Sequence, residues 1–160
     1  MEAGTADAMA AAHAALLVHG RLQPSIDAAT MALLDGHDGE AVVALAAAHP
    51  DASRSEAAEL VARAHEELGS GLERLTLPDA RRIALRALVL EARAGSRSLP
   101  EVTAWAHDAI GHSEDAVLEP IVALGDELEL RGGRSRADVD GILDRFLAAT
   151  ADDLARWRPA

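Results

Sequence analysis

The stretch Thr76–Gly95, TLPDARRIALRALVLEARAG, decides the fold of this chain because it is apolar around most of a helical circumference. At ~100° per residue, its Ala, Ile, Leu and Val side chains cover most of the helical wheel. Arg82, Arg86 and Arg93 share one narrow stripe of that wheel. We therefore predict a central core helix over residues 77–94, in which only the arginine stripe must reach water.

The two ends of this helix are marked by local signals. Thr76 and Asp79 have the spacing of a capping box, and Pro78 lies in the first turn, where its missing N–H costs nothing. Gly95 is placed to end the helix. Leu88 lies near the middle of the apolar run, so we expect its side chain to be at the centre of the core.

Helical spacing and capping residues recur along the rest of the chain. Stretches of apolar residues at helical spacing follow expected N-cap residues at Ser25, Asp38, Ser53, Ser98, Ser113 and Ser135. No stretch alternates β-branched and polar residues with the period of a strand. The pattern predicts an all-α fold, a compact single-domain bundle of about seven or eight helices over residues 1–160 around the central apolar helix.

Composition sets the material of the core and points to a source. The chain has 160 residues, 49% of them hydrophobic but only 2% aromatic, which is enough for one sizeable core built of Ala, Leu, Val and Ile. There is no cysteine, so neither a disulfide framework nor a thiolate zinc site is possible. All 15 basic residues are arginine, a bias that indicates a GC-rich coding sequence and an actinobacterium-like source.

Charge and hydropathy exclude several classes of partner. A net charge of -12 repels nucleic-acid phosphates, so we expect no binding to DNA or RNA. No apolar run reaches the ~18 residues of a membrane span, and residues 1–19 lack the basic start of a signal peptide. We expect a soluble cytoplasmic protein without a membrane partner.

Acidic residues gather in one segment of the second half. Between Ser113 and Leu130 there are six acids and no base: Glu114, Asp115, Glu119, Asp126, Glu127 and Glu129. Close like charges destabilise a helix, so helix stability does not explain the run. A role in solubility is one interpretation. We favour a second, in which the acids form a surface that steers a basic protein partner.

One polar face could hold a metal ion. Glu101, Asp108, His112 and Asp115 fall within ~60° of one another if a helix over this segment runs on past Gly111. Carboxylate and imidazole ligands suit zinc, manganese or iron. A solvated polar face explains the pattern more simply, so we predict no metal and no other cofactor.

Further signs of catalysis are weak. The seven histidines are scattered, mostly near expected helix ends or on polar faces, and no nucleophile motif or phosphate-binding loop is present. We expect no catalytic residue and no enzyme. Trp105 lies on an apolar stripe and is predicted to be in the core, whereas Trp157 is predicted to pin the end of the chain to the bundle.

The segment Leu34–Ala46, LDGHDGEAVVALA, followed by Leu60, Ala64 and the tripeptide 67–69, resembles a pattern in small uncharacterised actinobacterial helical proteins. One departure is Ala47, where the pattern has glycine. Small acidic all-helical proteins of this kind also resemble immunity proteins and antitoxins. That resemblance implies a protein that covers the active surface of a toxin, and it supplies no catalytic residue.

These observations lead to one favoured function and two alternatives. We favour a non-catalytic protein-binding module, immunity- or antitoxin-like, whose acidic helical surface meets a basic protein such as a toxin. The first alternative is a homodimeric regulatory or scaffold protein. The second is a small metal-dependent enzyme.

Overall fold

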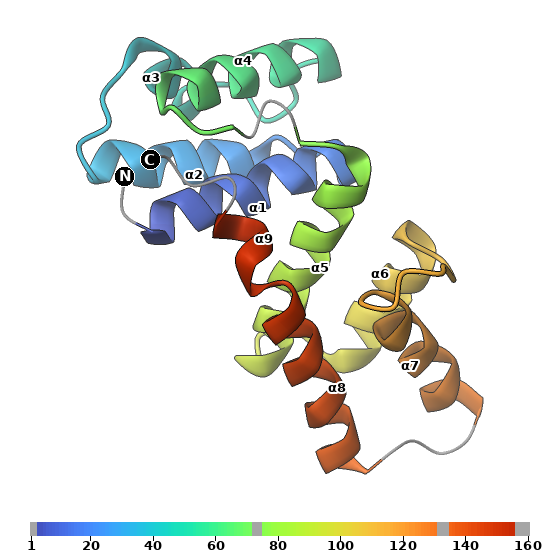
Figure 1. Ribbon diagram of the computed structural model, residues 1–160. Helices are drawn as coiled ribbons and strands as arrows, with labels where there is room; N and C mark the ends of the chain where they lie inside the picture. Colours follow the sequence, from blue (N-terminus) through green and yellow to red (C-terminus); the bar gives the residue numbers. More distant parts are fainter. Residues whose placement is uncertain (1–2, 72–74, 131–134, 156–160) are drawn as a thin grey trace. The chain divides into compact units, whose positions relative to one another are not determined.

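The computed structural model describes residues 3–71, 75–130 and 135–155 (Figure 1). Within these ranges the chain is helical and contains no strand, which confirms the predicted all-α class. None of the described helices combines the length and apolar character that crossing a bilayer requires. In chain order the helices are α1 (Ala3–His19), α2 (Gln23–Leu34), α3 (Glu40–Ala46), α4 (Arg54–Glu67), α5 (Leu77–Arg93), α6 (Leu99–Ala109), α7 (Glu119–Leu130), α8 (Arg136–Ala149) and α9 (Ala151–Ala155).

Contacts between residues divide the chain into two compact units. Unit 1 takes the described residues up to Ala80 and from Asp153 onward, and unit 2 takes Arg81–Asp152. In unit 1, α2 packs against α1 and α3, and α3 packs against α4; in unit 2, α7 packs against α6 and α8. The prediction was a single domain over residues 1–160. In the structure, most contacts between residues lie inside one or the other of the two units.

The predicted core helix is α5, and its ends agree with the local signals. The backbone N–H of Asp79 donates to Thr76 Oγ1 at 3.4 Å, and the backbone N–H of Thr76 donates to Asp79 Oδ2 at 3.3 Å. Gly95 follows the helix with a φ of +76°, a conformation that glycine adopts without the strain of a Cβ atom. Both ends are therefore set by residues close in sequence.

The buried face of α5 differs from the one expected. Leu85 and Val89 are fully buried in the core of unit 2, whereas Leu88 is only partly buried against that core. Leu90 is 46% exposed. The expectation that Leu88 lies at the centre is wrong, because apolar residues around most of a helix leave the buried face to be chosen by the neighbouring helices.

The arginine stripe of α5 meets α8, not water alone. Arg86 donates from Nη1 to the backbone carbonyl of Leu147 at 2.5 Å. About two turns further along α5, Arg93 donates to Asp140 at 2.5 Å and to Asp144 at 2.7 Å. The expectation of a solvated stripe is therefore corrected for Arg86 and Arg93. Their guanidinium groups form a polar seam between α5 and α8, where carboxylates and a carbonyl at the C-terminus of α8 attract them.

The core of unit 2 is aliphatic with one phenylalanine. Trp105, which was predicted to be in the core, is only partly buried against it, and Trp157 lies outside the described residues. The fully buried members from α6 and α7 hold those two helices together and so fix the polar side chains on their outer faces. The buried core residues of unit 2 are Leu85, Val89, Val102, Ala106, Leu118, Ile121, Val122, Leu124, Ile142, Leu143 and Phe146.

Three of the six predicted N-caps are confirmed, and Ser113 is not among them, because α7 begins later, at Glu119. Ser53, Ser98 and Ser135 each accept a hydrogen bond from the backbone N–H three residues further on. Ser25 does not cap α2, because that helix begins earlier, at Gln23, and the Ser25 side chain is buried in its first turn. Asp38 does not cap α3 either: the N-cap residue is Gly39, which has no side chain to accept a bond.

Candidate functional site

The C-terminus of α6 determines which polar side chains come together in unit 2. The helix ends at Ala109, and Gly111 follows with a φ of +71°, so the helix does not run on past Gly111. His112 therefore leaves the helical face on which it was expected. The four residues of the metal alternative, Glu101, Asp108, His112 and Asp115, do not form one face.

The other three members have separate positions. Glu101 completes the capping box of α6 by accepting a hydrogen bond from the backbone N–H of Ser98 at 2.9 Å. The pKa of the Glu101 carboxyl is lowered, first by the hydrogen bond from the Ser98 hydroxyl and then by this backbone bond. Asp115 accepts a hydrogen bond from Arg82 Nη1 at 3.3 Å. Asp108 is exposed beside a hollow between α6 and α7. Of the four, only His112 belongs to the cluster that the fold assembles.

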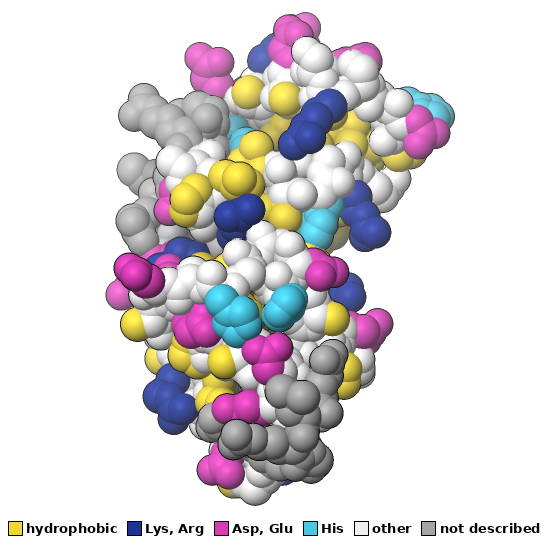
Figure 2. Space-filling model, turned by 90° about the vertical axis from the view of Figure 1, so that its right-hand side faces the viewer, with side chains coloured by type: hydrophobic (Ala, Val, Ile, Leu, Met, Phe, Trp, Pro, Cys, Tyr) yellow, Lys and Arg dark blue, Asp and Glu magenta, His cyan; other side chains and the backbone are white. Residues whose placement is uncertain are grey.

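That cluster, here called the histidine cluster, consists of His107, His112, Glu119 and Asp126. His112 lies between two carboxylates: its Nδ1 is 2.8 Å from Glu119 Oε1, and its Nε2 is 3.0 Å from Asp126 Oδ2. His107 Nε2 is 3.9 Å from Asp126 Oδ1, and the two imidazole rings meet edge-on with centroids 5.5 Å apart. Figure 2 shows two adjacent histidines with acidic side chains around them in the lower part of the view.

Electrostatics couple the members of the cluster. The hydrogen bond to Glu119, followed by the charges of Glu119 and Asp126, raises the pKa of His112 above its usual range. The pKa of Glu119 is lowered, first by the backbone N–H of Ser113, which it accepts at 2.9 Å, and then by His112. A positive charge on His112, whether a proton or a bound cation, is therefore favoured by two flanking carboxylates.

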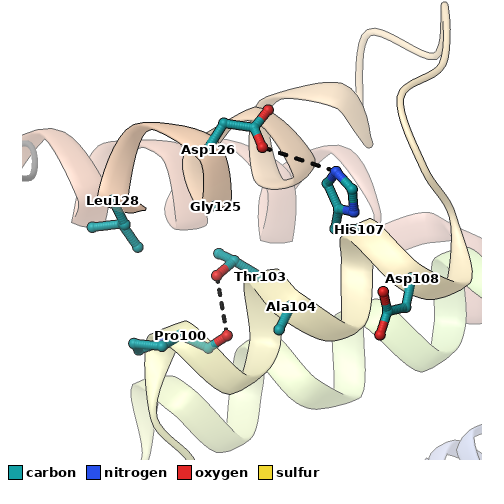
Figure 3. A pocket seen from close by; sticks show the side chains of 8 residues that line it. All are labelled: Pro100, Thr103, Ala104, His107, Asp108, Gly125, Asp126 and Leu128. Carbon is teal, nitrogen blue, oxygen red and sulfur yellow. Dashed lines mark hydrogen bonds and ion pairs between the residues drawn. The ribbon is translucent and has the colours of Figure 1, made fainter. Parts of the chain in front are cut away.

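A hollow of about 210 Å³ lies beside the cluster, between α6 and α7. Figure 3 shows His107 and Asp126 facing each other at its edge, while the Asp108 carboxylate turns away from Asp126. The helices approach closely at Gly125, where a Cβ atom would lie 3.2 Å from Thr103 Cβ. Gly125 thus lets α7 come near enough to α6 for the histidines and Asp126 to meet.

The six acids of the predicted partner surface have different environments. Asp115, Glu119 and Asp126 are half-buried and engaged with Arg82 or the histidines. Glu114 is exposed and Glu127 is half-buried, while the side chain of Glu129 lies outside the described residues. The segment therefore presents an acidic surface, but three of its six acids are already engaged with Arg82 or the histidines.

A second pair of histidines lies in unit 1. His13 and His65 are buried with ring centroids 4.9 Å apart, and His65 Nδ1 lies 2.8 Å from Ser70 Oγ. Burial, followed by the charge of His13, lowers the pKa of His65 to about 3. With His107 and His112, this pair corrects the expectation that the histidines are scattered on polar faces.

Sequence reasoning missed the histidine cluster for a geometric reason. Residues five apart on a helix point ~140° away from each other, so His107 and His112 show no shared helical face. Asp126 and Glu119 come from the next helix, and only the turn after Gly111 brings His112 back to them. A histidine on either side of a helix-ending glycine, followed by an acidic helix, was the one usable signal.

No family model, curated protein or solved structure matches this chain.

Proposed function

We propose that this protein is a non-catalytic protein-binding module that meets a basic protein partner through an acidic surface of unit 2. The observation that carries the proposal is the placement of the arginines. Arg82 pairs with Asp115, and Arg93 pairs with Asp140 and Asp144, so these cations are held between α5, α8 and the turn before α7. None of these pairs involves Glu114 of the predicted acidic run or Asp108 of α6.

The acidic surface is defined by Glu114, Asp126 and Glu127, with Glu129 added from the sequence; Asp108 of α6 is a further acid of unit 2. Asp108 and Glu114 are exposed. Acids gathered on one face create a negative potential that raises the rate at which a basic protein encounters it, often by ~10-fold or more. Exposed charges act in this way more on association rate than on final affinity.

An immunity- or antitoxin-like role is the form of this proposal that the resemblance favours. The work of such a protein is to cover a basic active surface, which needs complementary charge and no chemistry of its own. A gene for a secreted toxin encoded beside this one would support the role.

The experiment starts from a partner captured from the native host and purified. Its association with the immobilised chain is measured at low and at physiological salt, because exposed charges are screened beyond ~8 Å at physiological ionic strength. We expect the triple variant Glu114→Gln, Glu127→Gln, Glu129→Gln to associate about tenfold more slowly at low salt. This variant leaves the histidine cluster intact.

The matched control removes the same charge from unit 1. Glu56, Glu59 and Glu66 are exposed on α4, and their replacement by Gln changes the net charge equally. If both triple variants slow association by the same factor, only net charge matters and the unit 2 surface is not the binding site. Equal rates for the wild type and the unit 2 variant would also refute the proposal.

A further inference from the structure

We propose that His107, His112 and Asp126 form a binding site for a divalent transition-metal ion, zinc foremost, and that Glu119 positions His112 for it. This site shares Asp126 with the proposed acidic surface, but it rests on the two histidines. Its test changes none of the acids that are replaced in the protein-binding experiment, so the two proposals can fail separately.

The donor atoms have the spacing that a metal ion requires. One ligand atom from each of the three residues lies within 4.8 Å of the other two. Bonds of ~2.0 Å in a tetrahedral site place donor atoms ~3.3 Å apart. The distance from His112 Nε2 to Asp126 Oδ2 is 3.0 Å and that from His107 Nε2 to Asp126 Oδ1 is 3.9 Å, on either side of this value.

Glu119 supports the site from outside. Its Oε1 is 2.8 Å from His112 Nδ1, so a proton on Nδ1 leaves the Nε2 lone pair facing Asp126. The other carboxylate oxygen accepts the backbone N–H of Ser113, which holds Glu119 in place. A carboxylate behind a metal-bound histidine fixes its tautomer and raises its basicity as a ligand.

The donor set and its exposure point to the class of ion. Two imidazole nitrogens and one carboxylate suit zinc, nickel, copper or iron, whereas magnesium and calcium prefer oxygen ligands alone. The side chains of His107 and His112 are 52% and 51% exposed, so an ion can enter from solvent. Three protein ligands leave a fourth position for water or for a donor from outside the chain.

The test measures zinc binding to the whole chain after removal of metals with a chelator. Isothermal titration calorimetry should give one ion per chain for the wild type. His112→Ala and Asp126→Ala should each weaken binding by about 100-fold or more, since each removes a direct ligand. His49→Ala is the matched control: His49 is an exposed histidine in unit 1, and its loss should leave binding unchanged.

Glu119→Gln separates positioning from coordination. It keeps all three ligands but weakens the acceptor on His112 Nδ1, so we expect one ion per chain with about 10- to 100-fold lower affinity. Cobalt(II) provides a second readout, because its visible absorption reports nitrogen and oxygen ligands and should be lost in His107→Ala. Far-UV circular dichroism of each variant checks that the helices remain.

Two results would overturn the proposal. One is zinc binding of the wild type that is no tighter than that of folded His112→Ala, which would make the cluster an ion-pair network only. The other is one-to-one binding that survives in His112→Ala and Asp126→Ala, which would place the ion elsewhere on the chain. Competition by millimolar magnesium or calcium would contradict the assigned class of ion.

Discussion

The carboxylate of Glu67, at the end of α4, caps the start of α3 by accepting the backbone N–H of Ala41 at 2.8 Å. The N-cap residue of α3, Gly39, has no side chain that could do this. A Cβ atom at Gly39 would lie only 1.5 Å from Glu67 Oε1. The glycine therefore makes room for a cap that comes from another helix.

Replacing Glu67 by Ala should destabilise unit 1 by about 0.5–2 kcal/mol, the usual cost of losing an N-cap. Gly39→Ala should act on the same interaction, because the new methyl group displaces the carboxylate. In chemical denaturation, a double-mutant cycle should give a coupling of about 0.5 kcal/mol or more. Glu66→Ala is the control, since Glu66 is exposed on the same turn. Simple additivity of the two changes would mean that Glu67 is not the cap.

The buried face of α5 predicts a ranking of three leucines. Leu85→Ala should cost about 2–5 kcal/mol in the free energy of unfolding, because its side chain is fully buried. Leu88→Ala should cost less, and Leu90→Ala least, since nearly half of Leu90 is exposed. Urea denaturation of the three variants measures the order. A larger loss in the free energy of unfolding for Leu88→Ala than for Leu85→Ala would show that Leu88 lies at the centre of the core.

Arg86 and Arg93 should differ in what they contribute to the seam between α5 and α8. Arg86 donates to the carbonyl of Leu147 and, at 2.9 Å, to the hydroxyl of the buried Thr150, so Arg86→Met should cost about 1.5–3 kcal/mol. The Arg93 pairs are partly exposed, and Arg93→Ala should cost no more than about 1 kcal/mol. Raising the salt concentration should reduce the second effect only. Equal, salt-sensitive losses would contradict this assignment.

His65 should make stability depend on pH. Its pKa is about 3 in the folded chain but near 6.5 when unfolded, so protons bind the unfolded state preferentially. The contribution of His65 is complete above pH ~6.5 and is lost as the pH falls toward 3, by at most about 1.4 kcal/mol per pH unit. The pKa of His112 is raised and acts with the opposite sign, so variants must be compared.

The measurement is the free energy of unfolding between pH 7.5 and pH 5 for the wild type, His65→Gln and His49→Gln. His65→Gln should flatten the dependence on pH, because glutamine keeps a polar group near Ser70 but does not titrate. His49 is exposed and should leave the slope unchanged. A slope that is the same in all three proteins would show that the buried imidazole is not responsible.

The histidine cluster shows how little of a site can be visible in a sequence. Of its four members, His112 was a candidate metal ligand, and Glu119 and Asp126 were expected only as partner-binding acids; His107 was not singled out. Local periodicity cannot relate residues of α6 to residues of α7. The turn after Gly111 and the close helix contact at Gly125 bring them together, and both depend on the packed unit.

By itself, the sequence determined the all-α class and several helix ends. The capping boxes at Thr76 and Ser98 and the glycine after α5 act through bonds and dihedral angles within a few residues, so they are the same wherever the helix lies. Tertiary structure alone decided that Leu85 and not Leu88 is central, that Glu67 caps α3, and that the arginine stripe meets α8. The physical reason is that each of these contacts depends on which side chains from distant parts of the chain come within a few ångströms. The periodicity of one helix carries no information about which other helices pack against it.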